Sequence, residues 1–380
     1  ALTFTCGSGA NVIIPAGHTK VIATDGLGSG GVVHDLLTNV SFNGPTSTPT
    51  AGTSNYIAGV NAGNSIASGG NYNVAVGDEA GTSITTGDSN TLVGMNAGDA
   101  LTTAQYNVAI GHDALTTSIL GSRNIAIGTN ALYATNPASA VDMYNIGIGH
   151  NTGSAITTGI QNTLIGGLAG DAVTTGLRNT SVGYSSLSAT TTGNDNTAVG
   201  RSTLSANTTA ANNTAVGSAA LGANTTGASN TAVGKDALAA NTTGASNTAV
   251  GKDAMLAATT SPSNTVIGHT SGANITTGTG ENVMVGNRAG FGVTTGAQNI
   301  IIGDNACANG TMTGGLNVVI GDNAGLSMTT GASNVAVGGA SLDANTTGAS
   351  NVAIGWNSMT TSTTSSENTA VGQSSLGLNT

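Results

Sequence analysis

From residue 55 onward, β-branched residues and small residues alternate in short segments that recur about every 17 residues. The clearest segment is Asn-Thr-Ala-Val-Gly at residues 230–234, which returns unchanged at residues 247–251. The β-branched residues of each segment are two apart, so they lie on one face of an extended strand. Gly and β-branched residues dominate and no apolar stripe recurs at 3.6 residues. The pattern therefore predicts strands and excludes helices.

The repeats can be counted from the Asn that opens each one. Nineteen of these Asn residues, each followed four residues later by Gly, recur at a near-constant spacing and open the repeats; fourteen of the eighteen steps are 17 residues, three are 18 and one is 21. We name each residue by its position after this Asn, which is position 0. Position 4 is always Gly, and positions 12 to 14 are commonly Thr-Thr-Gly, which indicates a turn. The opening Asn residues stand at 55, 73, 90, 107, 124, 145, 162, 179, 196, 213, 230, 247, 264, 282, 299, 317, 334, 351 and 368.

A unit this short, with two expected strands and Gly-marked corners, is typical of one coil of a repeat architecture. The chain is therefore predicted to be all-β, a parallel β-solenoid or β-roll of about 19 coils with a 17-residue period. Coils stacked about 4.8 Å apart would give a rod of roughly 85 Å. The 21-residue step contains Asn136-Pro137, which predicts a loop that bulges from the rod.

Position 8 divides the coils into two classes. In eight coils it is Gly and position 11 is a large apolar residue, as in the pair Gly81 and Ile84. In the other eleven coils position 8 is Leu, Met or Cys and position 11 is not aliphatic, as in the pair Leu238 and Asn241. A close-packed interior needs a given volume filled once. We therefore expect positions 8 and 11 to point into the same space.

Position 2 lies on the opposite strand face from positions 1 and 3, and it is also apolar: Ala in ten coils and large in seven. A strand that is apolar on both faces is covered on both faces. Burying three aliphatic residues stabilises one coil by about 5–9 kcal/mol. The conformational entropy lost on ordering that coil costs about 25 kcal/mol, so a single thin rod has too little buried apolar surface of its own. We therefore predict a parallel homo-oligomer, specifically a homotrimer; the alternative is a monomer with position 2 on its surface. The candidate subunit-interface residues are Leu92, Leu164, Met284 and Ile301.

The first fifty residues do not repeat. Residues 2–5 and 11–24 read as strands, with Pro15-Ala-Gly17 as a turn, and residues 32–40 fit either a short helix or a strand. Pro, Ser and Thr gather without periodicity in residues 45–54, as in a linker. The predicted organisation is a small β module at 1–44, a linker at 45–54 and a solenoid shaft at 55–380.

Composition excludes several classes of function. The 380 residues carry a formal net charge of −10 with only 6% charged residues, so we expect no nucleic-acid partner and no charge-driven disorder. No apolar run approaches the roughly 18 residues of a membrane span, so no membrane insertion is expected. Two cysteines, Cys6 and Cys307, do not indicate a disulfide framework. The chain begins at Ala1 without a Met or a signal-type segment, and we expect it to be a piece of something longer.

Positions 5 and 6 vary most and are expected at the surface. The candidate surface-contact residues are Trp356, Tyr184, His112, His150 and His269. The histidines lie two and seven coils apart, so they cannot ligate one metal within one chain. The neighbours Lys235-Asp236 and Lys252-Asp253 should stack as a solvated charged patch.

A glycosidase needs two carboxylates about 5–9.5 Å apart. Asp78 with Glu79, or Asp304 with Asp322 one coil later, would meet that distance. Aromatic platforms for a sugar are nearly absent, however, since aromatic residues make up 3% of the chain. We therefore expect no catalytic residue, no cofactor and no metal, and hence no enzyme.

Several segments resemble known families. Residues 14–26 and 31–37, IPAGHTKVIATDG and GVVHDLL, resemble short β modules in tail fibres of marine bacteriophages. The tetrapeptides VAVG at 74–77 and 335–338 and VAIG at 352–355, each after an Asn, resemble the NSVAIG motif of trimeric autotransporter adhesin heads. Those heads are left-handed parallel β-rolls with threefold symmetry and a shorter period. The longer form, NTAVG followed by Leu and NTTG, resembles repeats of phage tail fibres and bacterial surface proteins.

This resemblance covers residues 55–380 and implies a left-handed, trimeric roll. It also implies a structural shaft in a virion tail fibre that serves host attachment. The alternative is an extracellular bacterial adhesin or a self-assembling surface filament. The expected partners are sister chains and a host-surface receptor or polysaccharide.

Overall fold

The computed structural model describes residues 51–377 in full and, before them, the backbone of four short strands. These strands are β1 (Leu2–Phe4), β2 (Val12–Ile14), β3 (Ile22–Thr24) and β4 (Val33–Asp35). β1 pairs antiparallel with β2, and β3 pairs antiparallel with β4. The segment that fitted either a helix or a strand thus contains a strand, whereas the predicted turn at Pro15–Gly17 lies outside the described residues.

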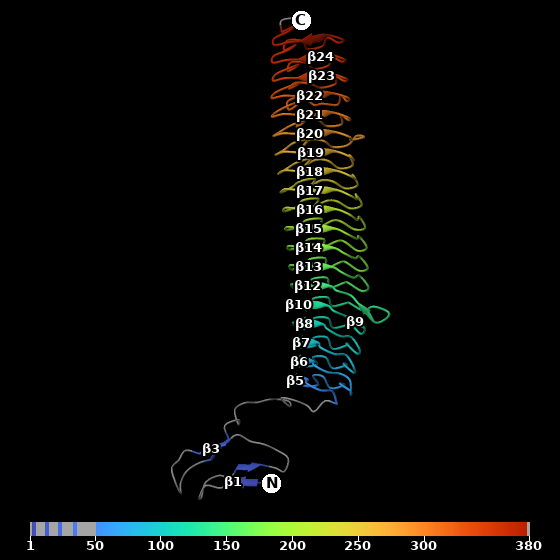
Figure 1. Ribbon diagram of the computed structural model, residues 1–380, viewed down its shortest axis with the longest axis vertical. Helices are drawn as coiled ribbons and strands as arrows, with labels where there is room; N and C mark the ends of the chain where they lie inside the picture. The colour runs from blue at the N-terminus through green and yellow to red at the C-terminus, as the bar shows by residue number, and fades with distance from the viewer. Residues whose placement is uncertain (1, 5–11, 15–21, 25–32, 36–50, 378–380) are drawn as a thin grey trace.

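The rest of the chain is a stack of coils, each contributing one strand to a single parallel sheet (Figure 1). Neighbouring strands pair without interruption along the rod, and β5 and β25 occupy its two ends, so the sheet is an open column. The predicted β-solenoid of about 19 coils is confirmed. The strands of the column are β5 (Tyr56–Ala58), β6 (Val74–Val76), β7 (Thr91–Val93), β8 (Val108–Ile110), β10 (Ile125–Ile127), β12 (Ile146–Ile148), β13 (Thr163–Ile165), β14 (Thr180–Val182), β15 (Thr197–Val199), β16 (Thr214–Val216), β17 (Thr231–Val233), β18 (Thr248–Val250), β19 (Thr265–Ile267), β20 (Val283–Val285), β21 (Ile300–Ile302), β22 (Val318–Ile320), β23 (Val335–Val337), β24 (Val352–Ile354) and β25 (Thr369–Val371).

Each strand covers positions 1 to 3, so the expectation of two strands per coil was wrong for most coils. The remainder of the coil is made of turns, because its backbone repeatedly enters the left-handed region: φ is 58° at Asp236, 52° at Leu238 and 60° at Ser246. These turns still bond from coil to coil, as when the Leu238 amide donates to the Ala254 carbonyl at 3.0 Å. Every position therefore stacks on its own equivalent.

The invariant Gly at position 4 has a steric cause. Gly234 adopts φ +136°, and a Cβ there would lie 2.4 Å from the carbonyl oxygen of Gly251 in the next coil. A side chain at this position would force the two coils apart, since both the conformation and the space admit only glycine. The close backbone approach lets the coils bend sharply after each strand.

The opening Asn forms a buried ladder along the rod. The Asn230 side-chain amide donates to Asn213 Oδ1 at 3.2 Å and to the Gly244 carbonyl at 2.9 Å. Asn230 Oδ1 in turn accepts from the backbone amide of Asn247 at 3.0 Å. The opening Asn residues thus form a stacked amide ladder, which satisfies the polar groups of the corner where one coil joins the next.

The strand face that points into the coil is the opposite of the predicted one. Position 2 points into the coil: Leu92, Leu164, Met284 and Ile301 are each fully buried inside their own chain, so they are not subunit-interface residues. Positions 1 and 3 point outward and are half-exposed in most strands. The physical reason is space, because the narrow interior takes one side chain per strand, from Ala up to Leu, Ile or Met, whereas pairs of β-branched residues fit the open outer face of a sheet.

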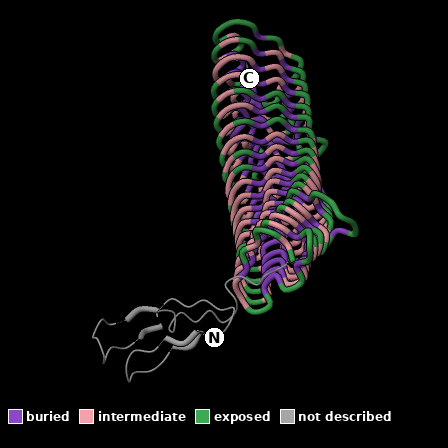
Figure 2. Tube along the Cα trace, turned by 60° about the horizontal axis from the view of Figure 1, so that its bottom comes forward, coloured by how far each residue is buried: buried purple, intermediate pink, exposed green. Residues whose placement is uncertain are grey.

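Positions 2, 7, 8 and 11 together fill the interior, and buried segments recur at the same place in every coil (Figure 2). A Cβ at position 8 of a Gly-class coil would clash with the apolar residue at position 11: at Gly81 it would lie 2.8 Å from Ile84 Cδ1. It would also lie 2.6 Å from Leu92 Cδ1, the position 2 residue of the next coil. The prediction that positions 8 and 11 share one space is therefore confirmed, and position 2 shares it too.

The 21-residue coil interrupts this regularity. Its extra residues form a protrusion whose return strand β11 (Val141–Asp142) pairs with β9 (Gly121–Ser122) of the preceding coil. Met143 is fully buried at the base of the protrusion, and its amide donates to the Ser122 carbonyl at 2.9 Å. The predicted bulge is thus confirmed as an anchored feature of the rod's side (Figure 1).

Candidate surface sites

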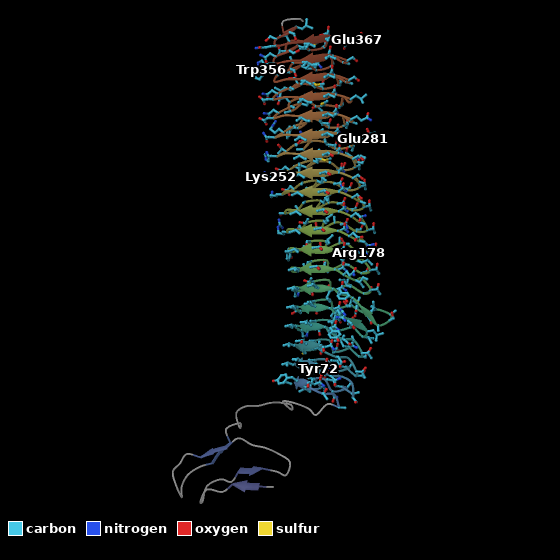
Figure 3. The ribbon with its side chains drawn as sticks, in the orientation of Figure 1. Tyr72, Arg178, Lys252, Glu281, Trp356 and Glu367 are labelled. Atoms are coloured by element: carbon cyan, nitrogen blue, oxygen red, sulfur yellow. The ribbon has the colours of Figure 1, made fainter. Side chains whose placement is uncertain are left out.

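The outer face of the sheet is an apolar stripe along the rod. Its members are the Val, Ile and Thr residues at positions 1 and 3, which stack in phase; Ile300, Ile302 and Ile354 are 40%, 37% and 39% exposed. Two columns of polar side chains border the stripe (Figure 3): Lys252 and Trp356 stand on one edge, and Arg178, Glu281 and Glu367 on the other. The first column is position 5 and the second is the residue directly before each opening Asn.

The structure places all five predicted surface-contact residues at position 5, on the first of these edges. They are exposed, as expected: Trp356 is 56% and Tyr184 58% exposed, and His112, His150 and His269 are exposed too. Trp356 lies against the preceding coil, where a Cβ on Gly339 would come within 2.4 Å of its ring. The five do not gather into one site, because two to five coils separate each from the next.

Charged side chains at positions 5 and 6 pair within their own coil. Lys235 contacts Asp236 at 2.6 Å and Lys252 contacts Asp253 at 3.0 Å, on adjacent coils. The hydrogen bond that Lys235 donates to the Asp236 carboxylate raises the pKa of Lys235. Both lysines are more than half exposed, so the predicted solvated charged patch is confirmed, and each pair contributes little to stability.

The carboxylates considered for glycoside chemistry are held by exposed amides. Asn61 donates to Glu79 at 2.7 Å, and Asn287 donates to Asp304 at 2.7 Å. Asp322 accepts from Asn323 at 3.1 Å. Through these hydrogen bonds the carboxylates link exposed residues of the same or neighbouring coils, and they do not line a sugar groove.

A hollow of about 500 Å³ lies beside the protrusion, at the other edge of the stripe. Arg123 is one of its lining residues, and its guanidinium stacks between two tyrosines, 4.6 Å from the ring centre of Tyr106 and 5.8 Å from that of Tyr144. Asp142 holds Arg123 Nε at 2.9 Å, and the same carboxylate accepts a long bond from the Tyr144 hydroxyl at 3.4 Å. The contact with Asp142 raises the pKa of Arg123 further.

Sequence reasoning missed this hollow, although a signal was present. Three of the six tyrosines, at 72, 106 and 144, directly precede an opening Asn, and Arg123 takes the same place between two of them. Equivalent positions stack, so the column alone indicates a Tyr-Arg-Tyr sandwich. The 21-residue step that supplies Asp142 predicts only a loop from the sequence.

A second hollow, of about 450 Å³, lies among position 6 and position 9 residues of neighbouring coils. Asp113, Asn130, Tyr133, Asn151 and Ser154 line it. Asn130 donates to Asn151 at 2.9 Å and Asn96 donates to Asp113 at 2.9 Å, so amide ladders occupy much of its polar lining. Each of the two hollows has a single carboxylate in its wall.

Four partly or fully buried groups have a raised pKa because of desolvation. Asp99, Asp171 and Asp343 share position 9; each has a raised pKa and one carboxylate oxygen without a hydrogen-bond partner among the described residues. Burial also raises the pKa of the Cys307 thiol to about 12. A thiol with that pKa is inert at neutral pH, and Cys307 is a free cysteine that serves as a small apolar core residue.

Within the described part of the chain, no cluster of three His, Cys, Asp or Glu side chains has the geometry to hold a metal ion. No helix there is long and apolar enough to cross a membrane. When the chain was compared with known proteins, no family model and no curated protein matched it.

Proposed function

We propose that this chain is the non-catalytic shaft of a bacteriophage tail fibre, a rod that holds a receptor-binding part away from the particle. Its architecture supports a spacer role: nineteen strands in continuous phase give about 85 Å of length without a hinge in the sheet. The tail-fibre-like repeats and the adhesin-like strand motif support this kind of protein over other β-solenoids.

The shaft assembles, in this proposal, as a parallel homotrimer through the outer face of the sheet. The observation that carries it is the apolar stripe at positions 1 and 3, which continues from β5 to β25. Soluble monomers seldom expose a contiguous apolar surface of this extent. The stripe also repeats once per coil, so a partner that covers it along its length must have the same spacing. A parallel copy of the same chain meets that condition.

Light scattering of the purified chain tests the assembly. We expect a mass three times the 36.4 kDa of one chain. Val216→Lys with Val233→Lys puts two charges on the stripe, where both valines are 37% exposed, and should shift the mass to that of a monomer. Thr226→Lys with Thr243→Lys is the matched control, because these exposed residues belong to the same coils but lie off the sheet face. A monomeric wild type would refute the assembly.

The second candidate is an extracellular bacterial adhesin or surface filament, which the VAIG strand at 352–355 favours because it resembles adhesin heads. It would use the same rod and the same stripe. Immunogold labelling with an antibody against the chain separates the two: decoration of phage tails supports the fibre, and decoration of bacterial cells supports the adhesin.

A further inference from the structure

We propose that the hollow beside the protrusion is a binding site for a neutral, pyranose-based saccharide. Its lining residues are Thr103, Gln105, Tyr106, Ser122, Arg123 and the protrusion residues 140–142. A volume of about 500 Å³ is within the usual range for small-molecule sites. The proposal deepens the proposed role in host attachment and rests on it, since it gives the side of the shaft a ligand on the host surface.

The site exists because the period is broken there. In regular coils the edge of the rod continues without interruption, whereas the 21-residue coil adds a wall beyond it. The wall is anchored by pairing of β9 with β11, by the buried Met143 and by the contact between Asp142 and Arg123. A loop whose only role was to absorb extra residues would not need these attachments.

The central side chains are already held in one arrangement. Arg123 is fixed by two aromatic rings and one carboxylate, so little side-chain entropy remains to be lost when a ligand binds. Asp142 contacts Nε of Arg123, and the guanidinium has further N–H donors for a ligand. Tyr106, which lines the hollow, is about half exposed at 49%, and its ring offers apolar surface to the C–H face of a sugar.

The polar lining suits hydroxyl groups. Within the described part of the chain, the Gln105 side-chain amide and the Thr103 hydroxyl have no hydrogen-bond partner. Ser122 Oγ accepts from the Gln105 backbone amide at 3.0 Å, which leaves its own proton free to donate. An amide, two hydroxyls, a guanidinium and a carboxylate together supply both donors and acceptors, as the paired hydroxyls of a sugar require.

The charges favour a neutral ligand. The one cation of the lining, Arg123, is neutralised by Asp142, and the whole chain carries a formal net charge of −10. A polyanion such as a nucleic acid or a sulfated glycan would therefore be repelled. A lipid is disfavoured as well, because most lining side chains are polar.

The test is binding of the full chain to an array of neutral hexose oligosaccharides, with heparin oligosaccharides on the same array, followed by calorimetry on the strongest ligand. We expect at least one neutral ligand to bind, and its association constant to fall at least tenfold in Gln105→Ala and in Tyr106→Ala. Tyr72→Ala is the matched control, since Tyr72 precedes an opening Asn as Tyr106 does and is 64% exposed, but lies two coils away from the hollow. It should bind as the wild type does.

No binding to any neutral glycan would overturn the proposal, as would preferential binding to heparin. Equal loss in Tyr72→Ala and Tyr106→Ala would overturn it too. Circular dichroism and light scattering of each variant show that the fold and the assembly are retained. The light-scattering mass of the wild type tests the proposed trimeric shaft, and the glycan array tests the proposed saccharide site. Failure of one proposal is therefore distinguishable from failure of the other.

Discussion

At the scale of single residues, the rod is stabilised by side chains whose hydrogen-bond partners lie in the adjacent coils. The opening Asn is the clearest case, because each amide bonds to its equivalents above and below and to a corner carbonyl. Between its two end members the ladder is buried, so a side chain that lacks the donor leaves polar groups unpaired in the interior.

Asn213→Asp should therefore destabilise the rod at neutral pH. It removes the amide donors to Asn196 Oδ1 and to the Gly227 carbonyl and adds a buried charge. The expected loss is at least about 1–3 kcal/mol, measured as the shift of the thermal or denaturant midpoint. Asn212→Asp is the control, since Asn212 is the neighbouring residue but is exposed. Equal midpoints for the two variants would contradict the ladder's role.

The contributions of Asp171 and Asp195 to folding stability should change with pH in opposite directions. Burial raises the pKa of Asp171, so its ionised form opposes folding at neutral pH, and the effect disappears once the pH falls below the ordinary value of 3.8. A hydrogen bond from Arg178 lowers the pKa of Asp195, so its ionised form favours folding above that value, and the contribution is lost as the pH falls.

Thermal melts between pH 7 and pH 3 check both signs. At pH 7, Asp171→Asn should melt above the wild type and Asp195→Asn below it, and both differences should shrink toward pH 3. A lower midpoint for Asp171→Asn at pH 7 would show that the carboxylate has a stabilising partner.

At the scale of one coil, the interior is filled by exchange among positions 2, 8 and 11. The Gly-class coil carries its bulk at position 11 and often at position 2, whereas the Leu-class coil carries it at position 8. Position 8 is left-handed in both classes, with φ +57° at Gly81 and +52° at Leu238, so the backbone does not change when the side chains do. The two classes are therefore two packings of one coil.

A class swap in the coil at 230–246 tests this. Leu238→Gly alone empties the interior and should lower the unfolding free energy by at least about 2–5 kcal/mol. Asn241→Ile alone overfills the interior and removes the donor to Asn224 Oδ1 at 2.8 Å. In the double variant the introduced isoleucine occupies the vacated space, while Asn230 still donates to the Gly244 carbonyl. The double variant should therefore be more stable than the sum of the single effects predicts, by about 1 kcal/mol or more. Simple additivity would contradict the shared space.

At the scale of the whole molecule, each coil contacts only its neighbours, so length and stability grow by repetition. The in-phase pairing across adjacent coils, such as Thr231 with Thr248 and Ala232 with Ala249, makes the joins between 17-residue coils equivalent. A rod of this kind tolerates the loss of whole coils but not of parts of coils.

Deleting residues 196–263, four steps of 17 residues, joins Asp195 to Asn264 in phase. Small-angle scattering should show a folded rod shorter by about 19 Å, four times the strand spacing. Deleting residues 196–255 instead joins Asp195 to Leu256 out of phase and should give an unfolded or aggregated product. Equal folding of both would refute the register argument.

The sequence by itself determined the period, the number of coils, the Gly corners and the exchange between positions 8 and 11. These features follow from steric constraints within one coil and between neighbouring coils, and the same constraints recur in all nineteen coils. It also located the loop at the 21-residue step and the exposed column that holds Trp356 and Tyr184.

Only the tertiary structure decided which strand face is interior. Alternation puts Leu92 opposite its β-branched neighbours but does not say which side is inside. That depends on the direction in which the left-handed turns at positions 6 and 8 close the coil. Tertiary structure likewise brought Arg123, Tyr106 and Asp142 together in the lining of one hollow, because an inserted wall has no repeat partner from which its path could be predicted.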